Sequence, residues 1–471
     1  MSQARGKENE ATKKTGSIPE PFESNHRSRR RYVLIICYNY PGIWADGVIR
    51  TYQFAKRLPC FGWQPIILTS QPWAENREDD IETADGALNC LRITVPRSRF
   101  LVPYQTDHDV LREPLDGIAP KANGIFAPVA EFVRQLPIPD GKIAWLPAAV
   151  KGGLRIARDY PVEMCFSVSP RPTAHLVARR LAQSLGIAWV ADFALPWSDA
   201  YWLTYRPRVM GWLDQRLQGS VLDSAQHVTV AYPDIGRGIC GRYGASWGRK
   251  ISVIPTGFDE DLFRGGRAGR RSKFTIVYPG HHFCEEGRHG ASFLRAVDEW
   301  VGSGRGLEDR VEFVFMGKRD DGLLRGRAAM AHAKAIRLEP LRSHKACVEA
   351  ILSSDACVVN AVGNRVPAKV YECMRAGKWV LALTDPGTDL ENLIRRYARG
   401  ISVPPRDGPG IGNALQRLFE QRDSEVAEPS EVDPSLAACS SRHGAESLAR
   451  IFEAVAASRG GGALPGLSLN L

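Results

Sequence analysis

The chain has 471 residues, of which 44% are hydrophobic and 24% are charged, the composition of a globular protein with about two or three domains and an ample core. No apolar run reaches about 18 residues, so the sequence predicts no membrane-spanning helix. The formal net charge of +10 permits three kinds of partner, which are nucleic acid, an anionic membrane surface and an anionic small ligand.

The N-terminal segment is polar and carries an excess of basic residues. Residues 1–28 contain no apolar stretch of the kind found in secretory signals, so we predict a disordered basic tail. The ten cysteines show no CxxC pair and no zinc-type spacing. They are therefore expected to be reduced thiols, mostly in the core of a cytoplasmic protein.

The first α/β unit follows this tail. Residues 32–37 read as a buried strand, residues 48–62 have the apolar spacing of a helix, and the run QPIILTSQ reads as a second strand. The unit has the length of a right-handed crossover. Its loop contains Gly42 and Gly47 but no GxGxxG, so the dinucleotide fingerprint is missing and a hydride-transfer enzyme is disfavoured.

A proline-rich region separates this unit from the next strands. Residues 99–147 are expected to be rich in loops, and the amphipathic segment 125–136 packs on its own domain or faces a membrane or an acceptor. Helices and strands alternate again from residue 148. The apolar run IAWVADFALPW ends with Asp192, at a position where α/β enzymes place chemistry, so Asp192 is the candidate catalytic residue. The alternative is a helix cap or an ordinary loop carboxylate.

We place the domain boundary near 256–268. The insert FRGGRAGRRSK is Gly- and Arg-rich, as linkers are, and a second α/β series follows it. We predict an α/β protein with two Rossmann-like, doubly wound domains that face each other across a cleft. The expected divisions are a tail at 1–28, a first Rossmann-like domain at 29–262, a second at 263–437, a helix at 438–458 packing back on the first domain, and a frayed tail at 459–471.

The stretch VPAKVYECMRAGK, residues 366–378, predicts a short helix between two apolar strands. Pro367 suits a first helical turn, and Gly377 suits a left-handed helix end. Lys369 and Glu372 are three residues apart and lie on one face of the helix start. The N–H groups of this end can bind a phosphate, and Glu372 can accept hydrogen bonds from sugar hydroxyls. The plain alternative is an ordinary helix with a surface ion pair.

Four motifs, taken in order, carry a resemblance to a known family. They are VLIICYNYPG…GVIRTYQFAKRLPCFGWQPIILT, CFSVSPRPTAHLVARRLAQSLGIAWVADFALPW, VIPTGFDEDLF and VPAKVYECMRAGKWVLAL. Over residues 31–455 the chain resembles bacterial glycosyltransferases of the two-Rossmann-domain (GT-B) fold, most closely the family-4-like group. The resemblance implies transfer of a sugar from a nucleotide-diphosphate sugar to a glycan or lipid-linked acceptor in polysaccharide or glycolipid biosynthesis. It also implies retention of configuration, with no metal and no other cofactor.

The same resemblance implies that 29–262 is the acceptor domain and 263–437 the nucleotide-sugar donor domain, and it implies roles for individual residues. Glu372 would bind the ribose and Lys369 the diphosphate, while the glycine loop at Gly280 would hold the phosphates. The implied donor-binding residues are Gly280, His281, Arg288, Asn364, Lys369 and Glu372, and those facing the acceptor and the sugar are Gly42, Gly47 and Trp197. Two positions depart from the family pattern. Asn364 stands where many members have a glutamate, and Ala194 and Leu195 stand where close relatives often have arginine and aspartate.

The sequence favours neither a metal nor a nucleic-acid site. His281, His282, Cys284 and His289 fit no standard metal-ligand spacing, and Asp320 and Asp321 are interpreted as surface residues of a polar loop. A nucleic-acid module is disfavoured because no recognised motif and no aromatic–basic interleaving occur. The basic surface is instead expected to hold the protein at the inner face of an anionic membrane, where a lipid-linked acceptor resides.

Two other functions stay open beside the transferase. A sugar-nucleotide epimerase of the same fold would need acid/base carboxylates and no acceptor groove. A non-catalytic nucleotide-sugar binder is favoured by Asn364 and by the altered loop after Asp192. Turnover with an acceptor separates the transferase from both.

Overall fold

The computed structural model divides the chain into two units, Met1–Arg30 and Arg31–Leu471, and all residues described here belong to the second. The described residues are 31–40, 47–70, 91–95, 138–198, 207–264, 269, 271–280, 282–284, 289–304, 306–317, 320–340, 343–397, 399–423 and 434–458. The predicted tails, Gly42, the segment 125–136, His281 and Arg288 lie outside them.

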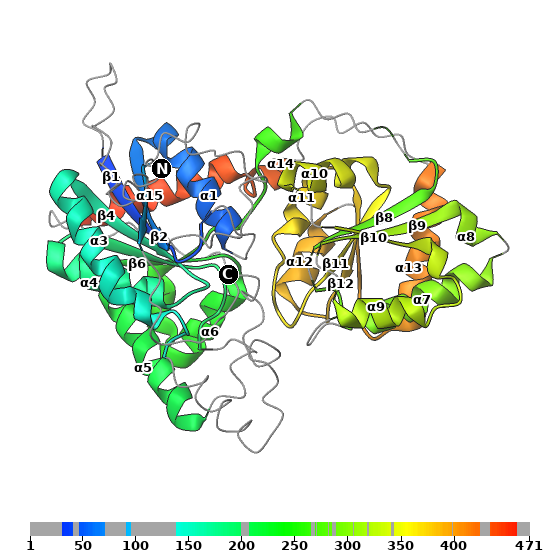
Figure 1. Cartoon of the computed structure of the whole chain (residues 1–471), viewed down its shortest axis with the longest axis horizontal. Coiled ribbons are helices and arrows are strands. Elements are labelled where there is room, and N and C mark those ends of the chain that lie inside the picture. The colour runs from blue at the N-terminus through cyan, green and yellow to red at the C-terminus, as the bar shows by residue number, and fades with distance from the viewer. Residues whose placement is uncertain are drawn as a thin grey trace, which may run out of the picture. The chain divides into compact units, whose positions relative to one another are not determined.

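The first half of this unit contains a seven-stranded parallel sheet in the order β3-β2-β1-β4-β5-β6-β7 (Figure 1). Its strands are β1 (Arg31–Ile36), β2 (Trp63–Ser70), β3 (Leu91–Val95), β4 (Val162–Val168), β5 (Ala188–Phe193), β6 (His227–Val230) and β7 (Ile251–Val253). The helices among them are α1 (Val48–Arg57), α3 (Leu146–Asp159), α4 (Thr173–Leu185), α5 (Arg208–Ser224) and α6 (Pro233–Tyr243).

The second half contains a six-stranded parallel sheet in the order β10-β9-β8-β11-β12-β13. Its strands are β8 (Phe274–Pro279), β9 (Val311–Met316), β10 (Ile336–Glu339), β11 (Ala356–Asn360), β12 (Trp379–Leu383) and β13 (Gly400–Val403). Its helices are α7 (Gly290–Ser303), α8 (Leu307–Arg310), α9 (Asp321–Ala328), α10 (His344–Ser353), α11 (Lys369–Arg375), α12 (Asp389–Arg396) and α13 (Gly408–Glu420). In both sheets the strand order reverses beside the first strand, as in doubly wound folds, which confirms the predicted fold class.

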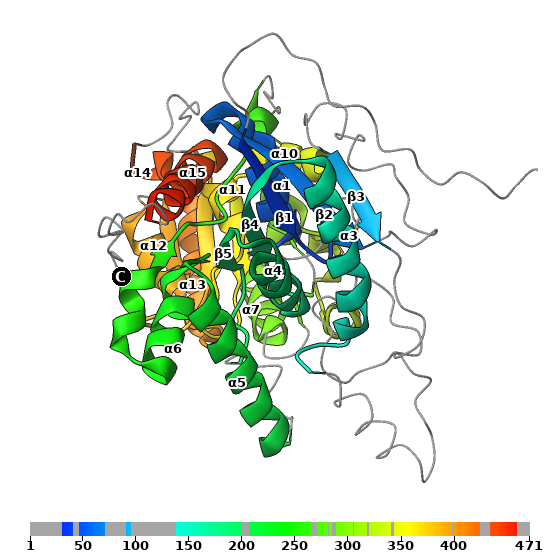
Figure 2. The ribbon, with the colours of Figure 1, turned by 90° about the vertical axis from the view of Figure 1, so that its left-hand side faces the viewer.

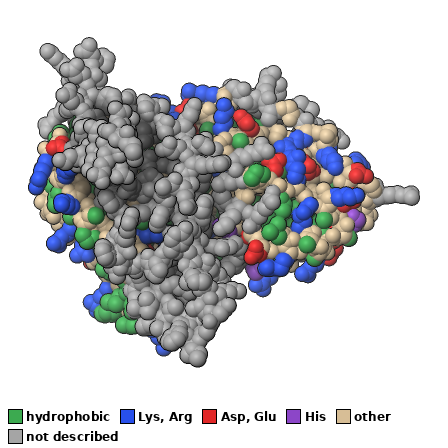
Figure 3. Space-filling view, in the orientation of Figure 1, with side chains coloured by type: hydrophobic (Ala, Val, Ile, Leu, Met, Phe, Trp, Pro, Cys, Tyr) green, Lys and Arg blue, Asp and Glu red, His purple; other side chains and the backbone are tan. Residues whose placement is uncertain are grey.

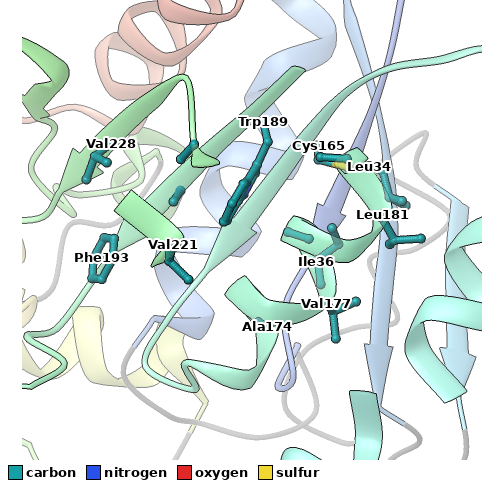
Figure 4. Close-up of a cluster of buried hydrophobic side chains, with 14 of the residues drawn as sticks. Leu34, Ile36, Cys165, Ala174, Val177, Leu181, Trp189, Phe193, Val221 and Val228 are labelled. Carbon is teal, nitrogen blue, oxygen red and sulfur yellow. The ribbon is translucent and has the colours of Figure 1, made fainter. Parts of the chain in front are cut away.

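Apolar side chains cover both faces of each sheet, which explains why the strands read as continuous apolar runs. On one face of the first sheet, Leu34 and Ile36 of β1 and Trp189 of β5 pack against Val177 and Leu181 of α4 (Figure 4). The helices α1 and α15 (Ser441–Ser458) pack together on the other face (Figure 2). The sheet is therefore sandwiched between two helical layers, and only its strand ends are available for a ligand.

Helix α15 joins the first half although it follows the second half in the chain. The ring centroid of Phe452 lies 5.1 Å from that of Trp63 and 5.6 Å from that of Phe166. The short helix α14 (Pro434–Ala437) precedes it. The segment that leads to α15 passes beside the chain at Phe258, and we call this place the crossing point. There the N–H of Phe258 donates to the carbonyl of Cys439 at 3.1 Å, and the N–H of Ser441 donates to the carbonyl of Phe258 at 2.8 Å.

The crossing point requires a glycine at position 257. Its φ is +69°, and a Cβ there would lie 2.1 Å from the carbonyl oxygen of Cys439. Next to it, Asp259 accepts hydrogen bonds from Lys56 at 2.5 Å and from Arg57 at 2.6 Å. Hydrogen bonds therefore join the segment 257–259 both to the segment 439–441 and to the end of α1.

The helix predicted over 366–378 is shorter in the structure. Helix α11 has only seven residues, because the chain makes a turn over 367–370 before regular helical bonding starts. Gly377 ends it with a φ of +66°, in the left-handed conformation that the sequence predicts. In the described part of the chain, no helix combines the length and the hydrophobicity that crossing a bilayer requires.

Candidate functional site

Two hollows lie at the carboxyl ends of the parallel strands, one in each half. The first opens beside the switch point between β1 and β4, and the second opens beside β8 and β9. The first is lined by Cys37, Tyr38, Asn39, Gly47, Val48, Thr51, Val168, Ser169, Pro170 and Arg171. The second is lined by Tyr278, Gly280, Phe283, Phe315, Met316, Gly317, Leu323 and Leu338. These are the places where doubly wound folds bind ligands.

Close approach of two loops shapes the first hollow. Gly47 precedes α1 with a φ of +83°, and a Cβ on it would lie 2.6 Å from the carbonyl oxygen of Ser169. Asn39 is only 7% exposed, and its side-chain oxygen has no hydrogen-bond partner among the described residues. A buried acceptor without a partner is costly unless a ligand supplies the donor. Asn39 was not predicted as a site residue, although its place shortly after an apolar strand was the available signal.

Asp192 lies at the end of β5 and is fully buried. It accepts two hydrogen bonds from Arg50 of α1, from Nε at 2.9 Å and from Nη2 at 2.7 Å, and a third from Thr229 at 2.5 Å. This paired carboxylate fixes α1, and with it the loop at Gly47, to the ends of β5 and β6. The geometry gives Asp192 a positioning role, while proton transfer by Asp192 stays a prediction.

Trp197 lies in the apolar core of the first half. Its indole N–H donates to Asp214 at 3.3 Å, and its ring stacks with His175 at 6.2 Å between centroids. A contact between Trp197 and an acceptor stays a prediction, because the described surroundings of the ring are protein side chains.

Aromatic rings line the second hollow. The ring of Phe283 lies 4.8 Å from the rings of both Tyr278 and Phe315. A Cβ on Gly280 would lie 2.9 Å from the ring of Tyr278, so a glycine is needed for this close approach. The side-chain oxygen of Asn360, at the end of β11, is buried without a hydrogen-bond partner among the described residues. The second hollow thus offers an aromatic wall, with a buried acceptor at the end of the neighbouring strand β11.

Helix α11 places a buried carboxylate at the same edge. Glu372 accepts a hydrogen bond from His344 of α10 at 2.5 Å and one from Lys369 at 2.9 Å. Burial raises the pKa of Glu372, but His344 and Lys369 outweigh this and lower the pKa to about 2. Glu372 is therefore ionised at neutral pH beside two hydrogen-bond donors. His344 was not predicted as a site residue, because a single histidine at a helix start forms no local sequence pattern.

Asn364 belongs to a group of polar residues that joins the two halves, which we call the bridging cluster: Asp234, Arg237, Asn364 and Asp389. The side-chain amide of Asn364 donates to Asp234 at 2.6 Å, and its oxygen accepts from the backbone N–H of Asp389 at 2.6 Å. Arg237 pairs with Asp389 at 2.6 Å. Both polar atoms of Asn364 are thus engaged within the protein.

Arg365 follows Asn364 and supplies a further cation to this edge. It is buried, and burial lowers its pKa to about 10, so it remains charged at neutral pH. The interpretation of Asp320 as a surface residue is wrong. Asp320 is buried and accepts hydrogen bonds from the backbone N–H groups of Cys284 at 3.1 Å and Leu323 at 2.6 Å, which caps α9. Among the described residues, no group of three or more His, Cys, Asp or Glu side chains is arranged to hold a metal.

Sequence comparisons find no matching protein-family model and no matching curated protein. Solved structures do match over most of the chain. A glycosyltransferase from Rickettsia africae matches with a TM-score of 0.61 at 12% identity, over 91% of this chain and 99% of its own. Sucrose-phosphate synthase from Thermosynechococcus elongatus matches with a TM-score of 0.56 at 16% identity, over 92% and 98%.

A third similar structure was solved with a nucleotide sugar. The Anabaena protein HepE in complex with UDP-glucose matches with a TM-score of 0.55 at 11% identity, over 91% of this chain and 99% of its own. At such identities the likeness is one of fold. The chain therefore has the two Rossmann-like domains of GT-B glycosyltransferases.

Proposed function

We propose that the protein is a glycosyltransferase of the family-4-like group, of hexosyltransferase type. It moves a sugar from a nucleotide-diphosphate sugar to a glycan or lipid-linked acceptor in polysaccharide or glycolipid biosynthesis. The observation that carries this proposal is the buried, ionised Glu372 between Lys369 and His344, at the carboxyl edge of a Rossmann-like sheet. The neighbouring glycosyltransferase structures, one of them bound to UDP-glucose, support the same function.

The donor nucleotide lies along the carboxyl edge of the second sheet. Glu372 accepts hydrogen bonds from the ribose hydroxyls, and the base lies beside the second hollow. Lys369, together with His281 and Arg288 of the glycine loop, binds the diphosphate. An ionised carboxylate suits the ribose because it is an acceptor only, and charge-assisted hydrogen bonds are about twice as strong as neutral ones.

The transferred sugar and the acceptor lie at the first hollow. Asn39 accepts a hydrogen bond from a sugar hydroxyl there, which satisfies its buried oxygen. Gly47 lines this hollow, and Gly42 and Gly47 are the glycines that we expect to face the sugar. Asp192 acts by positioning, because its pairing with Arg50 fixes the helix that carries this loop.

The residues at this edge fit transfer without a metal and with retention of configuration. As the sugar leaves, negative charge develops on the nucleoside diphosphate, and preorganised cations in a water-poor site stabilise it. Lys369 supplies such a cation next to Glu372, and Arg365 supplies another in the loop before α11. A cytoplasmic protein held at the inner face of the membrane fits a lipid-linked acceptor.

A thermal-shift experiment with UDP, GDP, ADP and dTDP tests the donor site. A nucleotide that binds only the folded protein raises the melting temperature by mass action. We expect one nucleotide to do so, and we expect Glu372→Gln to lose most of this rise. Glu349→Gln, on the exposed side of α10, is the matched control and keeps the full rise.

Two outcomes would count against the donor site. If no nucleotide raises the melting temperature, the protein does not bind these nucleotides. If the melting temperature of Glu372→Gln rises as much as that of the wild type, Glu372 does not bind the ribose. Circular dichroism at 20 °C confirms that each variant is folded before its rise is compared with the wild type.

A non-catalytic nucleotide-sugar binder is the second candidate function. It is favoured by Asn364, whose polar atoms are engaged in the bridging cluster instead of facing a sugar. Release of nucleoside diphosphate with an added acceptor supports the transferase, and binding without release supports the binder. A sugar-nucleotide epimerase would convert the donor sugar with no acceptor present.

A further inference from the structure

Helix α5 exposes apolar side chains and buries polar ones over its first three turns. Val209 is 58% exposed, Trp212 is 51% exposed and Leu213 is 37% exposed. On the opposite side of the same turns, Asp214 and Gln218 are almost fully buried. This is the reverse of what a surface helix of a globular protein shows.

The buried polar side of α5 is explained by hydrogen bonds within the protein. Asp214 accepts from the indole of Trp197 at 3.3 Å. Gln218 accepts from the hydroxyl of Tyr243 at 3.3 Å and from the side chain of Ser198. These contacts fix the rotation of the helix, so the apolar side must face outward. What remains unexplained within the chain is the exposed apolar side.

Two arginines flank the exposed apolar residues. Arg208 and Arg216 are exposed at positions that share this helix face, which we call the α5 face: Arg208, Val209, Trp212, Leu213 and Arg216. The guanidinium of Arg216 lies 4.6 Å from the ring centroid of Trp212. Figure 3 shows hydrophobic side chains beside basic ones over this helix.

The charges around the α5 face are mostly positive. Helix α4 packs against α5 through a hydrogen bond of 2.7 Å from Arg179 to Ser220, and it has no acidic residue. The exposed acidic residue of α5, Asp223, lies seven positions beyond Arg216, roughly 10 Å along the helix axis. The face therefore suits an apolar surface that carries negative charge.

The position of α5 connects this face to the first hollow. Helix α5 ends at Ser224 and β6 starts at His227, so its C-terminal end lies at the amino edge of the sheet. The helix runs back along the sheet for about 25 Å, which brings its exposed N-terminal turns to the carboxyl edge. The first hollow opens at that edge.

We propose that the α5 face docks on an anionic lipid membrane. Trp212 lies at the level of the headgroups, Val209 and Leu213 enter the boundary with the acyl chains, and Arg208 and Arg216 pair with anionic headgroups. Docking in this way holds the first hollow close to the lipid surface. The inference that the acceptor is lipid-linked rests on the proposed function, whereas the proposal that the α5 face binds a membrane does not.

A second copy of the chain fits this face less well than a membrane. A stable dimer typically buries about 800 Å² on each partner, far more than three side chains supply. In a two-fold dimer the same face would meet itself, which would bring the arginines of one copy toward those of the other.

Cosedimentation of the full chain with vesicles tests the proposal. Vesicles of phosphatidylcholine with about 30% phosphatidylglycerol are compared with pure phosphatidylcholine. We expect binding to the anionic vesicles, with Trp212→Ala/Leu213→Ser weakening it about tenfold or more. We expect Arg208→Glu/Arg216→Glu to weaken it by about 5-fold or more for each arginine. Leu324→Ser, at an exposed leucine of α9, and Arg395→Glu/Arg450→Glu are the matched controls and bind like the wild type.

The outcomes separate the membrane from other occupants. Unchanged binding in both α5 variants, or equal loss in the controls, overturns the proposal. A wild-type dimer in light scattering that becomes a monomer in Trp212→Ala/Leu213→Ser, with no vesicle binding, assigns the face to a second copy. No nucleotide is present in the vesicle experiment, so a failed donor site does not affect its result.

Discussion

Glu372 is a buried carboxylate that stays ionised at neutral pH. A buried carboxylate is normally protonated more easily than an exposed one, yet here Lys369 and His344 reverse that tendency. Both partners contact the carboxylate directly. Lys369 lies about one helical turn before Glu372 on α11, and His344 reaches Glu372 from the start of α10. The carboxylate therefore keeps its charge in a water-poor setting.

This arrangement makes stability depend on pH in a defined direction. The folded-state pKa of Glu372 is lowered from 4.5 to about 2. Its contribution, about 3 kcal/mol, is therefore present above pH 4.5 and is lost as the pH falls toward 2. Between pH 7 and pH 3.5 we expect the wild type to lose about 1 kcal/mol more unfolding free energy than Glu372→Gln, measured by urea unfolding. An equal loss in both proteins would contradict the lowered pKa.

Asp192 gives a second test at the scale of one residue. In Asp192→Ala the guanidinium of Arg50 stays buried without its carboxylate, which costs about 3–5 kcal/mol in the free energy of unfolding. We expect urea denaturation to show this loss, and Arg50→Met/Asp192→Leu to recover part of it. If Asp192→Ala is as stable as the wild type but inactive with donor and acceptor, Asp192 takes part in the reaction directly.

At the scale of elements, most of the fold follows from local patterns in the sequence. The run ACVVN is β11 because a parallel strand buried on both faces needs continuous apolar residues. Gly377 marks the end of α11 because a left-handed residue is needed there. Repeated strand–helix alternation then leaves few topologies beyond two doubly wound sheets.

The interactions that shape the candidate site are long-range and leave no local pattern. Arg50 is 142 positions from Asp192, and Asn364 is 130 positions from Asp234. Helix α5 shows the same limit in another form. Its apolar stripe at Val209, Trp212 and Leu213 has helical spacing, but spacing alone does not tell which side of a helix the rest of the protein covers.

At the scale of the whole molecule, the bridging cluster joins the ends of helices from both halves. Asp389 accepts the backbone N–H of Asp234 at 2.7 Å and pairs with Arg237, while Asn364 contacts both aspartates. Asparagine suits position 364 because its side-chain N–H donates to the carboxylate of Asp234, and a carboxylate at this position has no proton to donate. The hydrogen bonds of the bridging cluster therefore explain the asparagine at position 364 in physical terms.

Asn364→Glu tests this explanation. The added carboxylate repels Asp234 and Asp389, so we expect the bridging cluster to separate. Hydrogen exchange should then speed up by about tenfold or more at the backbone N–H groups of Asp234 and Asp389. Asn392→Glu, at an exposed position of α12, is the matched control and leaves both rates unchanged. Unchanged rates in Asn364→Glu would show that the cluster does not connect the two halves.

The return of helix α15 to the first sheet also sets an order of events during synthesis. The strands of that sheet are complete at Val253, but the apolar face that holds Trp63 and Phe166 is covered only in part, by α1, until Phe452 has been made. Ribosomes add about 5–20 residues per second, so the nearly 200 intervening residues take roughly 10–40 s. During that interval the first half exposes the apolar area that α15 later covers. The part of the chain that is made first is therefore the last to reach its finished state.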